Sequence, residues 1–227
     1  MSRFSLISLC CMFLGPVVLA DEPQFSGPQV GEKLSPFQAR DVFGEKAGED
    51  IDVLADVRDS PLLLVFVHKV TRPSVALSRL LMEYANTKKD AGLETRLVFL
   101  TNDPPDTEAW FRRARHALPK DVPPLISTDG LEGPGAYGLN RKMTATVLVA
   151  NKGKVTANLP LVQPSIQVDA PKIGHAIVKV LGGDAAPTLA EMGFHGRRMK
   201  MRKQAKLATT PEPVSYTHLT LPTICSV

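Results

Sequence analysis

The chain has 227 residues and a formal net charge of +4; 44% of its residues are hydrophobic and 22% are charged. This composition is typical of a globular protein and excludes a collagen, a coiled coil and a wholly disordered chain. A chain of this length holds either one domain with extensions or two small domains.

The first twenty residues have the layout of a secretory signal peptide. Arg3 precedes an apolar run over residues 4–14, and Val18 and Ala20 are small residues of the kind that a signal peptidase needs. The run is shorter than a typical membrane span. We expect cleavage near Ala20 and export to a periplasm or to the outside of the cell. A buried N-terminal helix is the alternative, but it gives no reason for small residues at these two positions.

The last part of the chain has an unusual sequence. Residues 214–223 read VSYTHLTLPT, which looks like a sequencing-library adapter translated as if it were coding sequence. A natural apolar tail is the alternative, and a match over ten consecutive residues disfavours it. Because segments of artificial origin carry no fold information, we treat residues 214–227 as an artefact.

All three cysteines of the chain lie in the two segments assigned above. Cys10 and Cys11 lie in the signal segment, and Cys225 lies beyond the adapter-like stretch. Residues 21–213 therefore contain no cysteine. This part of the chain cannot form a disulfide and cannot present a thiolate nucleophile.

Basic residues gather between the predicted domain and the adapter-like stretch. From residue 191 to residue 213 there are six basic and two acidic residues, the basic ones being Arg197, Arg198, Lys200, Arg202, Lys203 and Lys206. We expect residues 184–213 to be a flexible, solvated extension. Such a basic segment can contact an anionic surface, but nothing in it predicts specific binding of nucleic acid.

The first half of the domain predicts a hairpin, a strand and a helix. Residues 21–60 are rich in Gly, Pro, Asp and Glu and predict a lead-in with one hairpin. Residues 61–68, PLLLVFVH, form a continuous apolar run that is typical of a strand buried on both faces. The helix that follows is predicted to have Pro73 in its first turn and to end at Gly92, with one apolar face made of Leu77, Leu80, Leu81 and Tyr84.

The second half predicts alternating strands and helices. Residues 94–101 and 123–127 read as strands, and between them Asp106 or Thr107 is expected to cap a helix whose apolar side carries Trp110, Phe111, Ala114 and Leu118. Residues 144–161 predict two strands joined by a turn at residues 151–153. A last amphipathic helix ends at Gly182. Strands that alternate with helices predict an α/β domain, over residues 21–183, with one mixed sheet and helices on both of its faces.

The order of elements from about residue 31 to residue 183 resembles the thioredoxin-like fold, in its redoxin and peroxiredoxin-like branch. The buried strand leads into VTRPS, residues 70–74, which aligns with the family's Trp-Cys-Gly-Pro-Cys pentapeptide and retains Pro73. Residues 136–155 are similar to the family segment that passes through a cis-proline to a strand and an Asp/Asn-x-Gly-Lys turn. The resemblance implies a thioredoxin-like mixed β-sheet flanked by helices.

The chain departs from this family at its reactive positions. By the same alignment Thr71 stands at the nucleophilic cysteine, Ser74 at the resolving cysteine and Thr144 at the cis-proline. Thiol-disulfide exchange requires attack by a thiolate, and a hydroxyl cannot form a disulfide. The family's oxidoreductase activity is therefore not expected of these positions.

Two enzyme hypotheses stay open beside a binding role. A redoxin or peroxiredoxin-like enzyme would need a cysteine in a natural C-terminal sequence that the adapter-like stretch has replaced. A non-redox enzyme would use Thr71 as nucleophile and His68 as base, with Asp59 or Asp103 to orient the histidine. We expect no cofactor and no metal site, because His116 and His175 lack partners at metal-ligand spacing.

The leading hypothesis is an exported, non-catalytic binding or scaffold module. Thr71 and Ser74 are good capping residues, and Pro73 suits the first helical turn. His68, Lys69 and Arg72 would surround the positive end of the helix and could hold an anion there. Met143, beside the position of the cis-proline, completes the candidate binding residues. The expected partner is a peptide or protein in the groove where the family binds its substrates.

Overall fold

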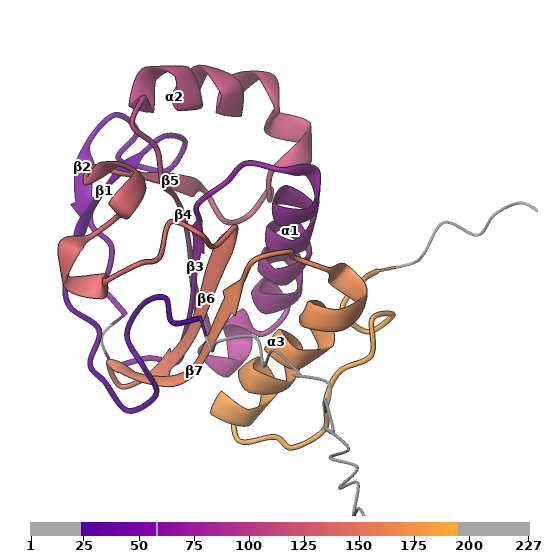
Figure 1. Cartoon of the computed structure of the whole chain (residues 1–227). Coiled ribbons are helices and arrows are strands. Elements are labelled where there is room, and N and C mark those ends of the chain that lie inside the picture. Colours follow the sequence, from indigo (N-terminus) through magenta and orange to yellow (C-terminus); the bar gives the residue numbers. More distant parts are fainter. Residues whose placement is uncertain (1–23, 58, 195–227) are drawn as a thin grey trace, which may run out of the picture. The chain divides into compact units, whose positions relative to one another are not determined.

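The computed structural model describes residues 24–57 and 59–194 (Figure 1). The predicted signal segment, most of the basic extension and the adapter-like stretch lie outside these residues. A seven-stranded sheet has the order β2-β1-β5-β4-β3-β6-β7. Its strands are β1 (Gln38–Asp41), β2 (Asp50–Asp52), β3 (Leu62–Val67), β4 (Glu94–Phe99), β5 (Pro124–Ser127), β6 (Ala145–Asn151) and β7 (Lys154–Leu161). The α-helices of the described residues are α1 (Arg72–Asn86), α2 (Pro104–Arg113) and α3 (Ile166–Val180).

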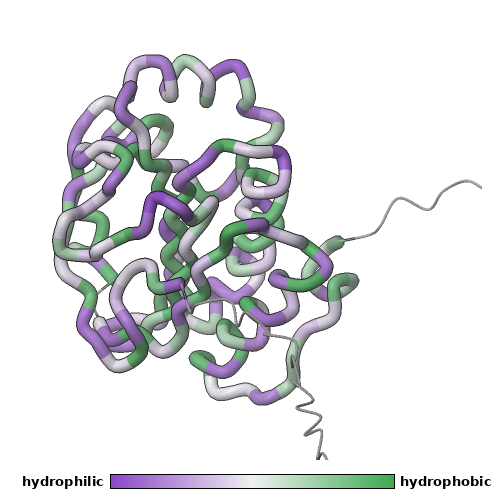
Figure 2. Tube along the Cα trace, viewed as in Figure 1, coloured by the Kyte–Doolittle hydropathy of each residue, from purple (hydrophilic) through white to green (hydrophobic). Residues whose placement is uncertain are grey.

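Strand β3 lies in the interior of the sheet, as its apolar run predicts. It pairs in parallel with β4 and antiparallel with β6. All six of its side chains are buried. Figure 2 shows the hydrophobic residues concentrated along these central strands. Since both faces of β3 are covered, its side chains have no need to alternate between apolar and polar.

The two faces of the sheet are covered differently. The apolar residues that α1, α2 and α3 bury all belong to one cluster, with Val65 and Val67 of β3. The opposite face carries Leu64 and Phe66 and is covered by segments outside the α-helices, among them Phe37, Val53, Leu54, Val57 and Tyr137. Helical structure on the opposite face is thus limited to a short 3-10 turn, Gly135–Tyr137, and the expectation of helices on both faces does not hold for the α-helices of the described residues. Both β3-α1-β4 and β4-α2-β5 step in the same direction along the sheet, and right-handed crossovers of that kind place their helices on the same face.

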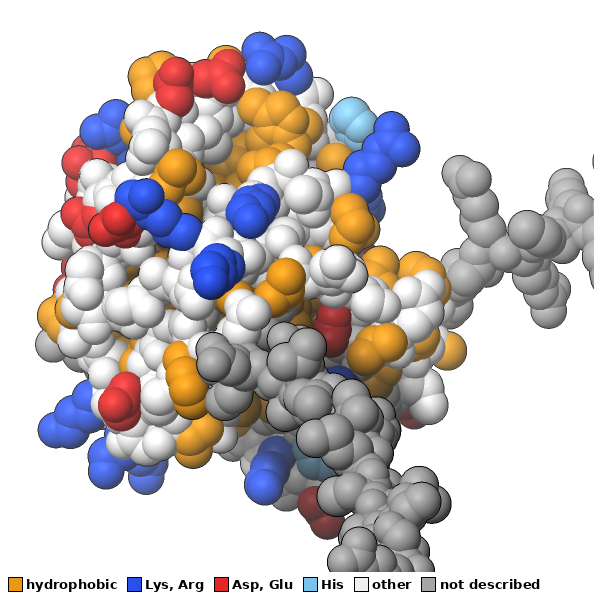
Figure 3. All heavy atoms as spheres, in the orientation of Figure 1, with side chains coloured by type: hydrophobic (Ala, Val, Ile, Leu, Met, Phe, Trp, Pro, Cys, Tyr) orange, Lys and Arg blue, Asp and Glu red, His pale blue; other side chains and the backbone are white. Residues whose placement is uncertain are grey.

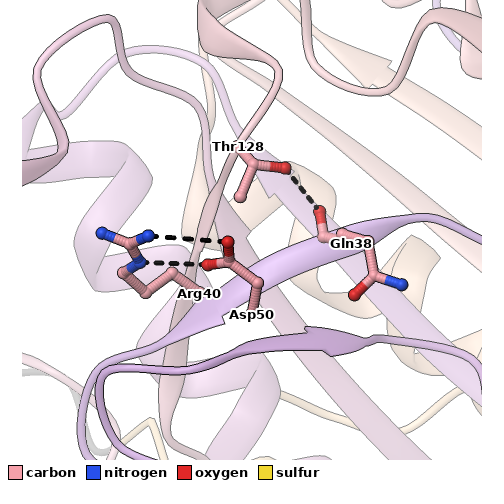
Figure 4. A network of polar contacts seen from close by, with 4 residues as sticks. All are labelled: Gln38, Arg40, Asp50 and Thr128. Carbon is pink, nitrogen blue, oxygen red and sulfur yellow. Dashed lines mark hydrogen bonds and ion pairs between the residues drawn. The ribbon is translucent and has the colours of Figure 1, made fainter.

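The predicted hairpin in the lead-in is β1 and β2, which pair antiparallel. Arg40 of β1 forms an ion pair with Asp50 of β2 at 3.0 Å, and the hydroxyl of Thr128, just past β5, donates to the carbonyl of Gln38 at 3.3 Å (Figure 4). These contacts join three neighbouring strands. Strand β2 forms one edge of the sheet, and its shortness and charge disfavour pairing with another chain.

The second hairpin joins β6 and β7 where the sequence predicts it. Lys152 and Gly153 form the turn with φ angles of 50° and 71°. Two consecutive positive φ values are those of a type I′ turn, whose twist matches that of the strands. Glycine adopts this backbone conformation without strain, which explains its place in the turn.

The boundaries of two helices differ from the predictions. Asp103, rather than Asp106 or Thr107, caps α2, because its carboxylate accepts the Asp106 amide at 3.0 Å. Helix α2 ends at Arg113, so the buried Leu118 lies beyond it. Helix α1 ends at Asn86, and Gly92 instead closes a separate 3-10 turn over Lys89–Ala91.

The packed part of the chain continues past residue 183, where we expected the domain to end. Met192 is buried in the cluster beneath the helices, and Leu189 and Phe194 pack against that cluster. Gly174 of α3 makes the close approach feasible, because a Cβ atom there would lie 2.5 Å from the Cγ atom of Pro187. Residues 184–194 thus form part of the fold rather than of a solvated extension.

The described residues contain no helix that is both long enough and apolar enough to cross a lipid bilayer.

Candidate functional site

The candidate site lies at the junction between β3 and α1, where Thr71 caps the helix. The Ser74 amide donates to Thr71 Oγ1 at 3.2 Å, and the Thr71 amide donates to Ser74 Oγ at 2.9 Å. The two hydroxyl oxygens lie 3.0 Å apart, and the buried Ser74 hydroxyl donates to the Lys69 carbonyl at 2.7 Å. This reciprocal capping box confirms the predicted structural role of Thr71 and Ser74.

The capping box changes what the helix start can bind. The first N–H groups of a helix normally lack a partner inside it and can hold an anion. Here the amides of Thr71 and Ser74 are already used, and Pro73 has no N–H. Among the first-turn donors, this leaves the Arg72 amide. An anion at this end would therefore depend on the side chains of Lys69 and Arg72, both of which are exposed.

His68 does not contribute a positive charge to this junction. Its side chain is 7% exposed, and Nε2 lies 2.9 Å from Thr146 Oγ1, which in turn lies 2.6 Å from Ser26 Oγ. Nδ1 is buried without a hydrogen-bond partner among the described residues. Burial, and secondarily the Lys69 ammonium group, lowers the pKa of His68 from 6.5 to about 4. The ring is thus neutral at neutral pH, because a buried imidazolium without a counter-ion is unfavourable.

The structure does not assemble a Thr71–His68 dyad. The Thr71 hydroxyl is hydrogen-bonded to Ser74, whereas the His68 ring faces Thr146. Asp103, one of the two aspartates considered as an orienting group, caps α2 with its carboxylate. The hydrogen bonds of the described residues therefore connect Thr71 to no general base.

The loop before β6 does not offer free backbone groups at Thr144 to an extended peptide. The Thr144 amide donates to the Leu161 carbonyl at 2.8 Å, and the Thr144 carbonyl accepts the amides of His68 and Lys69. The described residues contain no cis peptide bond. Because both backbone groups of Thr144 are already paired, they are not free to pair with an extended ligand. Met143 is fully buried, so the prediction that its side chain contacts a ligand is wrong.

An open groove lies beside the junction, between the start of α1 and the segment from α2 to the 3-10 turn Arg115–Ala117. We call it the α1–α2 groove; its volume is about 440 Å³, and its lining residues are Val70, Thr71, Arg72, Val75, Ala76, Arg79, Trp110 and Ala117. Figure 3 shows hydrophobic side chains gathered beside α2 on this face, with basic side chains nearby. Val70 is 49% exposed and adds apolar surface to the groove.

The charges of the α1–α2 groove are positive. None of its lining residues is acidic. Arg79 forms an ion pair with Glu83 at 2.7 Å, and it also donates to the His116 carbonyl. Arg72 has no ion-pair partner among the described residues. The groove therefore combines an apolar wall, one half-buried indole ring and one uncompensated guanidinium group.

Only part of the predicted site lines this groove. Thr71 and Arg72 do so, while Ser74 is buried beneath the junction and His68 and Met143 are buried as well. Val75, Arg79 and Trp110 also line the groove, although no motif in the sequence marks them as site residues. Trp110 was predicted as part of an apolar helix face, but no local pattern shows which segment that face meets. Among the described residues, no group of three or more His, Cys, Asp or Glu side chains could hold a metal ion.

Comparisons with known proteins bear on the fold. No protein-family model matches the chain, and no curated protein matches it. A candidate thiol:disulfide interchange protein DsbE from Chlorobium tepidum is similar in structure, with a TM-score of 0.54 and 19% identity over 68% of this chain and 99% of that chain. The chain has a thioredoxin-like fold. A hypothetical protein from Sinorhizobium meliloti is also similar, with a TM-score of 0.52 and 17% identity over 71% of this chain and 89% of that chain.

At the junction between β3 and α1, this thioredoxin-like domain carries two hydroxyl side chains. Thr71 and Ser74, which the sequence resemblance places at the family's two cysteines, are joined by hydrogen bonds between the amide of each and the hydroxyl of the other. The junction is thus stabilised by capping, and the open surface beside it is the α1–α2 groove.

Proposed function

We propose that the thioredoxin-like domain is a non-catalytic binding module that takes up an apolar and acidic peptide segment of a partner protein in the α1–α2 groove. The observation that carries this proposal is the position of the groove. It adjoins the junction where the resemblance places reactive cysteines, yet the groups present there are capping hydroxyls and an arginine that has no ion-pair partner within residues 24–57 and 59–194.

The contacts of Thr71 support a non-catalytic role. A hydroxyl nucleophile needs an adjacent general base that takes its proton. The Thr71 hydroxyl instead lies 3.0 Å from Ser74 Oγ, and the neutral His68 is bound to Thr146. Residues 24–194 contain no cysteine that could replace it as nucleophile.

The lining of the α1–α2 groove defines the chemistry of its ligand. Trp110 and Val75 are partly buried and form an apolar wall. Aromatic residues and arginines are the residue types that contribute most to binding at protein interfaces. Arg72 can bind a carboxylate in bidentate geometry. We therefore infer that the bound segment places an apolar side chain against Trp110 and an aspartate, a glutamate or a terminal carboxylate near Arg72.

Selection from a random peptide library, followed by fluorescence-anisotropy titration of the selected peptides, tests this role. The selected peptides should combine an apolar residue with an acidic one. Val75→Glu places a like charge against the acidic ligand and should weaken binding by at least about tenfold. Arg72→Gln should weaken binding by about three- to tenfold and should reduce its salt dependence.

Lys142→Gln is the matched control, because Lys142 is an exposed cation that does not line the groove. This variant should bind the selected peptides like the native protein. Failure to select any peptide, or equal affinity of the Val75→Glu and native proteins, would refute the proposal.

We further infer that the module acts after export, and that the basic residues from Arg197 to Lys203 contact an anionic surface there. The support for export is the pattern of residues 1–20, with Arg3, the apolar run and Ala20. Expression of the full chain in a host with a secretory pathway tests it. N-terminal sequencing of the exported protein should begin at Asp21, and retention of an uncleaved chain inside the cell would contradict it.

A further inference from the structure

A second groove lies on another part of the sheet, between β7 and α3. We call it the α3–β7 groove; its volume is about 470 Å³, and its lining residues are Asn151, Thr156, Ala157, Leu159, Lys172, His175, Ala176, Lys179 and Val180. It shares no residue with the α1–α2 groove. Neither the family resemblance nor the proposed peptide binding assigns a role to it.

The connection between β7 and α3 creates this groove. The chain leaves β7 at Leu161 and enters α3 at Ile166, and the helix then runs back alongside the strand (Figure 1). Ala157 and Leu159 of β7 and Ala176 and Val180 of α3 are partly buried against the core cluster. The floor of the groove is therefore apolar, and it belongs to a well-packed part of the sheet.

The rim of the α3–β7 groove is positively charged. Lys172, His175 and Lys179 lie at positions i, i+3 and i+7 of α3, which places them on one helix face. The rise of an α-helix separates the two lysines by about 10 Å along its axis. No acidic residue lines the groove, and neither lysine has an ion-pair partner among the described residues.

One end of the groove holds two polar groups that are available to a ligand. Because the helix runs back along the strand, Lys179 lies toward the end that carries Asn151 and Thr156. The Asn151 side-chain amide has no hydrogen-bond partner among the described residues, whereas the Thr156 hydroxyl donates to the Val149 carbonyl at 3.0 Å. An ammonium group and an amide N–H are thus both available to an acceptor at this end.

We propose that the α3–β7 groove binds a small amphipathic anion. The apolar body of the ligand lies on Ala157, Leu159 and Ala176, and its carboxylate, sulfonate or phosphate group accepts hydrogen bonds from Lys179 and Asn151. The volume of the groove lies within the usual range of small-ligand sites, roughly 300–1,000 Å³. Lysines are depleted at the centre of protein interfaces, so a groove lined by two of them fits a small anion better than a protein partner.

A titration with 8-anilinonaphthalene-1-sulfonate (ANS), an apolar ring system with one sulfonate group, tests the proposal on the full chain. ANS fluorescence should rise on binding, and sodium decanoate should displace it. The double variant Lys172→Gln/Lys179→Gln should bind ANS at least about tenfold more weakly. Lys142→Gln makes the same change at an exposed site outside the groove and should bind like the native protein.

Further variants distinguish the α3–β7 groove from the α1–α2 groove and from a membrane contact. Val75→Glu changes the α1–α2 groove and should leave unchanged the part of ANS binding that depends on Lys172 and Lys179. Ala157→Phe fills the floor of the α3–β7 groove without changing charge and should block binding. Equal ANS affinity in the native protein and the double lysine variant would overturn the proposal, as would loss of binding in Val75→Glu alone. Lysine-dependent binding to phosphatidylglycerol vesicles that decanoate does not inhibit would also overturn it, in favour of a membrane contact.

Discussion

Thr71 and Ser74 cap each other at the start of α1, each amide donating to the hydroxyl oxygen of the other residue. In the resemblance to redoxins these two positions belong to the reactive cysteines. Here their side chains satisfy helix-terminal N–H groups, so the junction stabilises the fold.

Thr71→Ala should lower the free energy of unfolding by about 1 kcal/mol, because it removes the N-cap acceptor of α1. Thr71→Ser keeps the acceptor and should retain most of the stability. Urea denaturation followed by circular dichroism measures both variants. If alanine and serine at position 71 gave the same stability as threonine, the capping box would not contribute to stability.

Replacing both residues by cysteine should create a disulfide at the junction. Thr71 Oγ1 and Ser74 Oγ lie 3.0 Å apart, so sulfur atoms in these positions would be within reach of each other. The Thr71→Cys/Ser74→Cys variant should therefore form a 71–74 bond under mild oxidation, identified by mass spectrometry of the proteolytic peptide. The Ser74→Cys single variant is the control and should keep a free thiol at position 74. A double variant that keeps both thiols free would show that the junction geometry does not suit a disulfide.

His68 should make the stability of the protein depend on pH. Its pKa in the folded state is lowered to about 4, below the usual 6.5. Between these two values the unfolded chain binds a proton that the folded chain does not. The free energy of unfolding should therefore fall as the pH falls from about 6.5 to about 4, by an amount on the order of 3 kcal/mol. Outside this pH window His68 should not contribute to the change of the free energy of unfolding with pH.

The comparison with His68→Gln isolates this contribution, because carboxylates titrate in both proteins. The glutamine variant should lose less stability than the native protein over the same pH window. Chemical denaturation at a series of pH values between about 4 and about 7 supplies the data. Parallel stability curves for the two proteins would show that His68 does not titrate with a lowered pKa.

Asn158 should hold the lead-in segment against β7. Its side-chain amide donates to the carbonyls of Ser26 and Pro28, each at 2.9 Å. Asn158→Ala leaves these partly buried carbonyls unpaired and should lower the free energy of unfolding by about 1–3 kcal/mol. The Gly31 amide, which donates to the Val155 carbonyl, should exchange its hydrogen faster. Asn86→Ala, whose side chain bonds only at an exposed site, should leave the Gly31 exchange rate unchanged, and an unchanged rate in Asn158→Ala would contradict this role.

Local patterns were sufficient to predict most elements of the fold. The apolar run of β3, the helical spacing of Leu77, Leu81 and Tyr84, and the Lys152–Gly153 turn each correspond to an element that the structure contains. The cap of α2 was missed, because several polar residues near its start are acceptable caps. Asp103 takes the role since Pro104 and Pro105 follow it as the first helical residues.

The role of a site residue could be predicted only where it depends on residues close by in the sequence. Thr71, Pro73 and Ser74 lie within one helical turn, so their capping role follows from spacing. The burial of His68 and Met143 depends on segments far away in the chain. His68 meets Thr146 and Ser26, and no local pattern predicts that these side chains share a buried network.

The sequence by itself determined the order of strands and helices, the buried central strand and the lack of cysteine in residues 21–213. These features depend on residue type and on periodicity along a short stretch of chain. Only the tertiary structure decided that the described α-helices lie on one face of the sheet, that His68 is neutral, and that the α1–α2 and α3–β7 grooves exist. Each of these features depends on how two or more separate elements pack against each other, which local periodicity does not encode.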